Sequence, residues 1–174
     1  MRARPDWPRW KQGTKQEVAA HKKLGTWSKV KVNNKKHKAI KMRFVFDIEH
    51  DAGTNMTRYN AQLVAQGFNQ VPGRDFHETW APVPNAATTR ALFAKAAATG
   101  WEVHHVDVKT AFFSAKMDQE MYSKPPDGIE PEGVEEMCRL NLTQFGTKQA
   151  GRLWGITLDK QLKEIGAVKS KVDS

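Results

Sequence analysis

Residues 43–83 read RFVFDIEHDAGTNMTRYNAQLVAQGFNQVPGRDFHETWAPV. Apolar and polar residues alternate through Ile40–Ile48 and again through Met56–Ala65, which is the period of a strand with one buried face. The cluster Asp51–Asn55 between them contains the Gly and Asn of a tight turn, so the two segments predict a β-hairpin. The Gly- and Pro-rich stretch Gly67–Pro84 that follows predicts irregular chain.

The segments on either side of this hairpin mix predicted helices with predicted strands. Trp10–Leu24 predicts a short amphipathic helix, and the alanine-rich Thr88–Thr99 predicts a second helix that ends at Gly100. Trp101–Val108 predicts a strand that enters the core. Further along we expect a loop at Pro125–Gly133, a short strand at Cys138–Leu142 and a helix at Lys148–Ile165 closed by Gly166. These elements lack a regular β–α–β alternation, so the predicted class is α+β.

Composition narrows the class of protein. The chain has 174 residues, of which 39% are hydrophobic, and these values indicate a globular domain rather than a disordered tail. No apolar run approaches the roughly 18–20 residues of a membrane-spanning helix, so we expect no membrane partner. The single cysteine, Cys138, excludes an internal disulfide and a cysteine-based zinc site, and we expect it to be a buried thiol. It favours a reducing, intracellular compartment: the cytoplasm, the nucleus or a mitochondrion.

Positive charge is concentrated near the N-terminus. Residues 1–43 hold 14 Lys or Arg against two Asp or Glu, whereas the whole chain has a net charge of +9. Clustered cations favour a polyanionic partner, because each cation near a phosphate releases condensed counterions. A basic face that only improves solubility is the alternative. The candidate RNA-binding residues are Arg2, Arg4, Arg9, Lys11, Lys22, Lys23, Lys29, Lys31, Lys35, Lys36, Lys38, Lys41 and Arg43.

Tryptophan and histidine residues raise two further possibilities, base stacking and metal binding. Trp7 and Trp10 lie among these cations and are candidates for stacking on bases. The other four tryptophans are expected to pack in the core: Trp27, Trp80, Trp101 and Trp154. His104 and His105 adjoin Asp107, but neighbouring residues of a strand point to opposite faces, so we expect no metal site there.

Several segments resemble, in order and spacing, the reverse transcriptase of copia-type long-terminal-repeat retrotransposons. Gly25–Trp27 reads GTW, similar to the family's early n-T-W, and residues 43–83 resemble kWVFkiK…G…ryKARLVAkGf.Q..GiDy.eTFaPV. Residues 106–128 read VDVKTAFFSAKMDQEMYSKPPDG, which resembles lDVktAFLnG.L.EeiYm.qP.G. Residues 138–154 read CRLNLTQFGTKQAGRLW, which resembles crLkksLYGLKQAprqW. The resemblance implies the fingers and part of the palm of a polymerase fold.

The family's chemistry implies roles for particular residues. Nucleotide addition uses two divalent metal ions that carboxylates hold. The resemblance implies that Asp107 is the first of these carboxylates and that Val108 offers a backbone carbonyl to the same metal. It places Phe112 where the family has an aromatic residue that screens the sugar 2′ position. It also places Lys148 and Gln149 beside the incoming nucleotide and the template.

The chain departs from the family pattern at positions that carry chemistry. The family's remaining metal carboxylates lie in a Y-x-D-D hairpin, and the sequence ends at Ser174 before that hairpin would begin. Asn60, Gln62 and Gln66 stand where the family pattern has K, R and k, so three positions that would meet triphosphate or template are neutral amides. We therefore expect Asp107 to be vestigial, with no metal bound.

The resulting expectation is a truncated, non-catalytic reverse-transcriptase-like protein. It would be reused as an RNA-binding or structural component of a ribonucleoprotein assembly such as a ribosome, with RNA and other proteins as partners and no cofactor. An inert product of a decayed gene is a further reading. The alternative is a fragment of an active retrotransposon RNA-directed DNA polymerase, in which Asp107 would hold Mg²⁺. Residues 1–25 would form a basic extension and opening helix, and residues 26–174 the fingers and partial palm.

Overall fold

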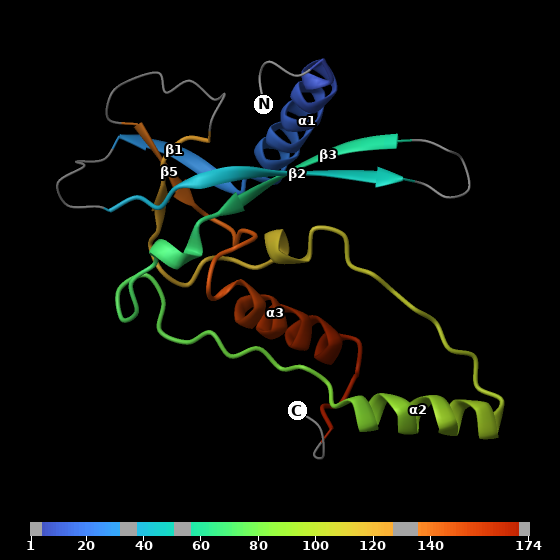
Figure 1. Cartoon of the computed structure of the whole chain (residues 1–174). Helices are drawn as coiled ribbons and strands as arrows, with labels where there is room; N and C mark the ends of the chain where they lie inside the picture. The colour runs from blue at the N-terminus through green and yellow to red at the C-terminus, as the bar shows by residue number, and fades with distance from the viewer. Residues whose placement is uncertain (1–4, 32–37, 51–56, 127–135, 171–174) are drawn as a thin grey trace.

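The computed structural model describes residues 5–31, 38–50, 57–126 and 136–170 (Figure 1). These contain three helices, five strands and two short 3₁₀ turns. In chain order they are α1 (Trp7–Leu24), β1 (Trp27–Lys31), β2 (Met42–His50), β3 (Thr57–Ala65), η1 (Gly67–Asn69), α2 (Ala86–Thr99), η2 (Ala111–Ser114), β4 (Tyr122–Ser123), β5 (Glu136–Leu140) and α3 (Ala150–Glu164). Helices and two antiparallel sheets share the chain, which confirms the predicted α+β class. None of the described helices is long and apolar enough to cross a membrane.

The predicted β-hairpin is present as β2 and β3. The two strands run antiparallel with Met42 opposite Ala65, while the turn predicted at Asp51–Asn55 lies outside the described residues. Along β3 the buried residues are Ala61, Leu63 and Ala65, and the residues between them are half-buried. This alternation is the two-residue period seen in the sequence, and it directs one face of the hairpin into the core.

Helix α1 packs against the hairpin through Trp10 and Gly13. The Trp10 side chain is 4% exposed, and its ring centroid lies 5.2 Å from that of Phe46 and 4.7 Å from that of Tyr59. A Cβ atom on Gly13 would lie 2.8 Å from the carbonyl oxygen of Tyr59, so the close approach of helix and strand requires glycine. The expectation that Trp10 stacks on bases is therefore wrong, because its ring is core. Half-buried Trp7 lies edge-on to Phe46 at 6.4 Å.

Glu17 and His21 tie α1 to both sheets. Oε1 of Glu17 accepts the backbone N–H of Leu63 in β3 at 2.9 Å and lies 3.3 Å from Nε2 of His21. The fully buried His21 contacts Oγ1 of Thr26 through Nδ1 at 2.8 Å, directly before β1. Burial alone would raise the pKa of Glu17, but the hydrogen bonds with His21 and Leu63 lower that pKa below its ordinary value.

The second sheet has the strand order β1–β5–β4. The sequence did not predict β1, because its residues belong to the lysine-rich N-terminal segment, and β5 spans Glu136–Leu140 rather than Cys138–Leu142. Cys138 is 1% exposed, as predicted. In the described part of the chain, a cluster of buried side chains joins this sheet to the hairpin: Ile40, Met42, Leu63, Ala65, Met121 and Leu140.

Helix α2 and the chain after it lie apart from both sheets (Figure 1). The side chain of Asn85 caps the start of α2, and only Ala96 of the helix is buried. Residues 101–108 form no strand, and Val106 is 79% exposed, so the predicted core strand is wrong. The physical reason is that no described strand lies beside this segment to pair with its backbone N–H and C=O groups.

The four tryptophans predicted to be core residues divide into two pairs. Trp27 and Trp154 are half-buried, and Trp27 packs against the buried cluster. Trp80 is 68% exposed and Trp101 is 54% exposed, so the core placement of these two is wrong. The Trp101 ring instead lies beneath the ammonium group of Lys95, 5.1 Å from the ring centroid, on the outer surface of the molecule.

Candidate nucleic-acid interface

The residues proposed as metal ligands lie on exposed chain. Asp107 and Val108 belong to the irregular stretch between α2 and η2; Asp107 is exposed, and Val108 is 44% exposed. Asp107 therefore does not lie at the end of a core strand, where it was expected. Within the described ranges, no three His, Cys, Asp or Glu side chains lie close enough together to share a metal ion.

Phe112 lies in η2 and packs against the turn that leads into α3. Its ring centroid is 5.0 Å from that of Phe145, edge to face, and the neighbouring buried Phe113 contacts the same ring at 5.5 Å. Oγ1 of Thr143 donates a hydrogen bond to the carbonyl oxygen of Phe112. The structure therefore brings Phe112 to the segment that carries Lys148, and leaves Asp107 outside this contact.

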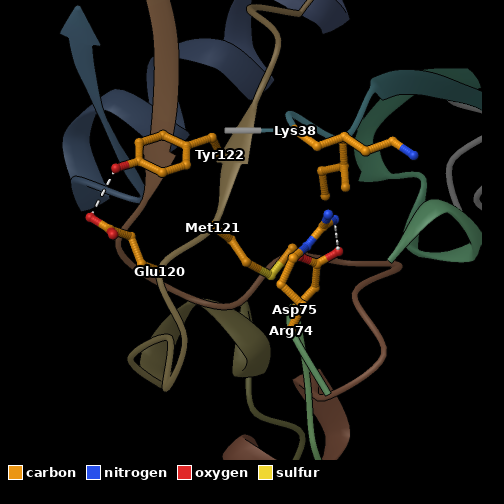
Figure 2. Close-up of a pocket in the computed structure, with 7 residues that line it drawn as sticks. Lys38, Arg74, Asp75, Glu120, Met121 and Tyr122 are labelled. Atoms are coloured by element: carbon orange, nitrogen blue, oxygen red, sulfur yellow. Dashed lines mark hydrogen bonds and ion pairs between the residues drawn. The ribbon is translucent and has the colours of Figure 1, made fainter. Parts of the chain in front are cut away.

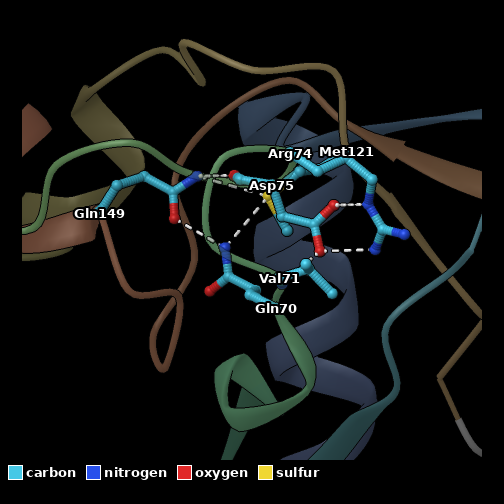
Figure 3. Close-up of polar contacts among 6 residues, drawn as sticks. All are labelled: Gln70, Val71, Arg74, Asp75, Met121 and Gln149. Atoms are coloured by element: carbon cyan, nitrogen blue, oxygen red, sulfur yellow. Dashed lines mark hydrogen bonds and ion pairs between the residues drawn. The ribbon is translucent and has the colours of Figure 1, made fainter.

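Gln149 is enclosed in a buried network of side-chain amides (Figure 3). Nε2 of Gln70 donates to Oε1 of Gln149 at 2.8 Å, and Nε2 of Gln149 donates to the carbonyl oxygen of Asp75 at 3.0 Å. Oε1 of Gln70 accepts the backbone N–H of Lys148 at 2.7 Å. The side chain of Gln149 is 0% exposed, whereas that of Lys148 is exposed. The amide of Gln149 is thus hydrogen-bonded to other groups of the protein. Its expected proximity to a nucleotide stays a prediction.

An ion pair between the adjacent residues Arg74 and Asp75 stabilises the loop that these glutamines contact. Nε and Nη2 of Arg74 donate to the two carboxylate oxygens of Asp75 at 2.7 and 2.8 Å. The backbone N–H of Val71 donates to the same carboxylate at 2.8 Å. The hydrogen bond from Arg74 lowers the pKa of Asp75 below its ordinary value, against the opposing effect of burial. The loop from residue 70 to residue 75 is therefore rigidly specified.

A small hollow of about 220 Å³ opens above this loop (Figure 2). Its charged lining is mixed, because Lys38 and Arg74 face Asp75 and Glu120. The hydroxyl of Tyr122 donates to Oε1 of Glu120 at 2.8 Å, and burial together with that bond raises the pKa of Tyr122. The two cations and two anions of the lining balance one another, so this hollow offers an anion no excess of positive charge.

The candidate RNA-binding cations reach the surface wherever the structure describes them. Nine are exposed, and the other four, Arg2, Arg4, Lys35 and Lys36, lie outside the described residues. Arg9 is engaged by Tyr59, with its guanidinium 5.5 Å from the ring centroid. The remaining eight are Lys11, Lys22, Lys23, Lys29, Lys31, Lys38, Lys41 and Arg43.

Two residues that the sequence did not single out lie beside these cations. Lys124 and Phe68 line the same hollow of about 660 Å³ as Lys38 and Lys41. Lys124 follows the short strand β4, and Phe68 lies in η1, so neither belongs to the basic N-terminal segment. The signal for Phe68 was a phenylalanine in a loop otherwise made of Gly, Asn and Gln, where an apolar ring has no core to enter.

Comparison with known proteins decides the family. Residues 24–174 match the family described as reverse transcriptase (RNA-dependent DNA polymerase). The chain belongs to the reverse transcriptase family. The match covers most of the chain, and it confirms the copia-type resemblance drawn from the motifs. The proposed boundary between residues 1–25 and 26–174 stays a prediction.

The reverse transcriptase match is supported by relatives from plants and yeast. The chain is 35% identical over 159 residues to the Retrovirus-related Pol polyprotein from transposon TNT 1-94 of Nicotiana tabacum, covering 91% of this chain and 12% of that protein. It is 32% identical over 167 residues to the Retrovirus-related Pol polyprotein from transposon RE2 of Arabidopsis thaliana, covering 95% and 12%. It is 27% identical to the Transposon Ty1-LR3 Gag-Pol polyprotein of Saccharomyces cerevisiae, covering 86% and 8%. No solved structure matches.

Proposed function

We propose that this reverse transcriptase chain forms the fingers and part of the palm and binds RNA through its exposed basic residues, without catalysing nucleotide addition by itself. The observation that carries the proposal is the surface position of every described cation in the basic N-terminal segment. Cations at the surface can come close to the phosphates of a polyanion, and family membership favours RNA as that polyanion.

The non-catalytic part of the proposal is supported by residues of the hairpin. Asn60 donates from Nδ2 to Oε1 of Glu49 at 3.1 Å, and Gln62 is half-buried on the same strand. Neutral amides at these positions, and at Gln66 after the strand, supply no positive charge to a triphosphate. Asp107 is the one carboxylate that the motifs assign to a metal ion, and a two-metal reaction requires several oxygen ligands.

The wider role that we propose is that of an RNA-binding or structural part of a ribonucleoprotein assembly. A chain that binds RNA without catalysing a reaction needs the RNA or other proteins to carry out the activity of the assembly. The observation in favour is the same exposed basic surface, because surface cations can bind RNA without a metal ion or a conformational change. Purification of the chain with its partners, followed by sedimentation, tests this role; a discrete RNA-containing particle is the expected result.

RNA binding itself is tested by titrating a labelled single-stranded RNA at several salt concentrations. With about six phosphate contacts, the log–log slope should be about −4 to −5. Deleting residues 1–43 is unsuitable, since it removes the buried Trp10, Ile40 and Met42. Replacing Lys22, Lys29 and Lys31 by Gln should instead flatten the slope by about 2.

A control and a contrary outcome complete this experiment. The triple replacement of Lys95, Lys160 and Lys169 by Gln removes the same charge from α2, from α3 and from the chain that follows α3. It should leave the slope nearly unchanged. Equal slopes for the two triple variants would show that Lys22, Lys29 and Lys31 serve only as a solubilising surface.

A second candidate function is a fragment of an active RNA-directed DNA polymerase. The relatives are Pol polyproteins, and the chain spans 12% of the two plant proteins quoted above. In that case the basic surface would serve a larger enzyme, and Asp107 would act together with carboxylates supplied from elsewhere in it. Template-dependent primer extension that Asp107→Asn abolishes would distinguish this candidate from the first.

A further inference from the structure

Phe68 is the most exposed of the Phe, Tyr and Trp residues in the described part of the chain. It is 74% exposed, although it lies directly after the buried strand β3, in η1. Burial of a phenylalanine ring stabilises a fold, so a ring held in water gives up that stabilisation. The ring is therefore accessible to a ligand.

The backbone beneath Phe68 is firmly held. Gly67 is buried against the carbonyl of Gly146, and a Cβ atom on either glycine would collide with the opposite backbone. The N–H of Ala65 donates to the carbonyl oxygen of Phe145 at 2.7 Å, and Gln70 on the far side of η1 is fixed to the start of α3. The ring is thus presented by a rigid turn, which is the property of a stacking platform.

Two hollows flank the ring, and both are basic. The larger, of about 660 Å³, is lined by Lys38, Lys41 and Lys124 in addition to Phe68. Among the residues that the structure describes, no Asp or Glu lines either hollow. The smaller, of about 320 Å³, carries the other two cations, Arg43 and Lys148.

We propose that Phe68 and the five cations around it form a binding site for single-stranded RNA, in which a base stacks on the ring and the adjoining phosphates meet the cations. We call this set the Phe68 surface: Lys38, Lys41, Arg43, Phe68, Lys124 and Lys148. An exposed aromatic ring between cationic grooves is the arrangement that proteins use to hold single strands. The inference rests on the proposed RNA-binding function and assigns to it a site that the N-terminal cations alone would not define.

Single-stranded RNA fits this surface better than the other anionic partner, an acidic protein segment. A carboxylate-rich segment would use the cations and would gain little from a rigid ring that stands 74% exposed in the middle of them. A duplex would keep its bases stacked inside, out of reach of the ring. A single strand supplies both an unstacked base and closely spaced phosphates.

The test measures the affinity of the full chain for labelled oligouridine of about 12 nucleotides. Phe68→Ala should weaken binding by about 5- to 150-fold, the range expected for the loss of one stacked base. Its salt slope should match that of the wild type, because the ring carries no charge. Phe68→Tyr should restore binding, and Phe93→Ala, which removes another exposed ring on α2, should leave binding unchanged.

A second arm tests the cations, and the outcomes separate the two proposals. Lys41→Gln, Lys124→Gln and Lys148→Gln should each flatten the salt slope by about 0.7. No RNA binding by the wild type overturns the proposed function and this site together. If the wild type binds RNA, and Phe68→Ala and Phe93→Ala change its affinity equally, the Phe68 surface is overturned. The proposed RNA-binding function then still stands. Equal displacement of the RNA by polyglutamate of the same charge overturns the assignment to RNA.

Discussion

The side chains of Gln70 and Gln149, 79 residues apart in the sequence, meet in a hydrogen bond of 2.8 Å between Nε2 of Gln70 and Oε1 of Gln149. This bond joins the loop after the hairpin to the start of α3 (Figure 3). Both side chains are buried, at 6% and 0% exposure, so neither amide has water as a substitute partner. The pair therefore fixes the distance between the two segments from which Phe68 and Lys148 project.

Replacing Gln149 by Leu should destabilise the fold. The substitution keeps the approximate side-chain volume but removes the donor to the carbonyl oxygen of Asp75. It also removes the oxygen acceptor of Nε2 of Gln70, which keeps only its weaker bond to the sulfur of Met121. We expect a loss of about 1–3 kcal/mol in the free energy of unfolding, measured by urea denaturation. Gln161→Leu on the exposed face of α3 is the control. A loss no larger than that of the control would contradict the role of the network.

Replacing Trp10 by Ala should lower the free energy of unfolding much more than replacing Trp101 by Ala. Trp10 is enclosed by Phe46 and Tyr59, so Trp10→Ala should cost about 3–5 kcal/mol. Trp101 is 54% exposed and lies against Lys95, so Trp101→Ala should lower the free energy of unfolding by less than about 1 kcal/mol. Thermal unfolding of both variants provides the comparison. A larger loss from Trp101→Ala would restore the core strand that the sequence predicted.

The buried contacts of Glu17 should make stability depend on pH. Its pKa in the folded chain lies below the ordinary value, so its contribution is complete above the unfolded pKa of about 4.3 and is lost as the pH falls through the folded pKa. Glu17→Gln keeps an acceptor for the N–H of Leu63 and cannot titrate. Below about pH 4.3 the wild type should therefore lose more stability than Glu17→Gln in urea denaturation series. Parallel curves would refute this assignment.

Asp107→Asn should leave the fold almost unchanged. The side chain is exposed on irregular chain, and Asn keeps its shape, so we expect a change within about 1 kcal/mol in the free energy of unfolding. Millimolar Mg²⁺ or Mn²⁺ should shift the melting temperatures of the wild type and Asp107→Asn equally. A metal-dependent rise in the wild type that Asp107→Asn removes would reveal a functional metal ligand.

The features that were predictable from the sequence are those set by local pattern. The hairpin follows from strict alternation in two neighbouring segments, and α2 follows from an alanine-rich run that ends at Gly100 with φ +69°. Helix α1 begins at Trp7, three residues earlier than predicted, because Pro8 is tolerated in a first helical turn. In each case, neighbouring residues carry the information.

The features that depend on distant packing were not predictable in the same way. The strand β1 forms because β5 pairs with it, from Trp27 opposite Leu140 onward. Residues 101–108 have a strand-like pattern but no described partner. The Phe68 surface combines Lys41, Phe68, Lys124 and Lys148 from four separate segments, so no single motif records it. Only their assembly around η1 brings an aromatic ring and the cations together.

The most direct test of the central claim, RNA binding without nucleotide addition by this chain, is a primer-extension assay in which template binding is recorded in the same sample. The sample contains the full chain, a primed RNA template with a single-stranded overhang, nucleotides, and Mg²⁺ or Mn²⁺. We predict saturating template binding with no incorporation above the control without protein. Template-dependent extension that Asp107→Asn abolishes would contradict the claim.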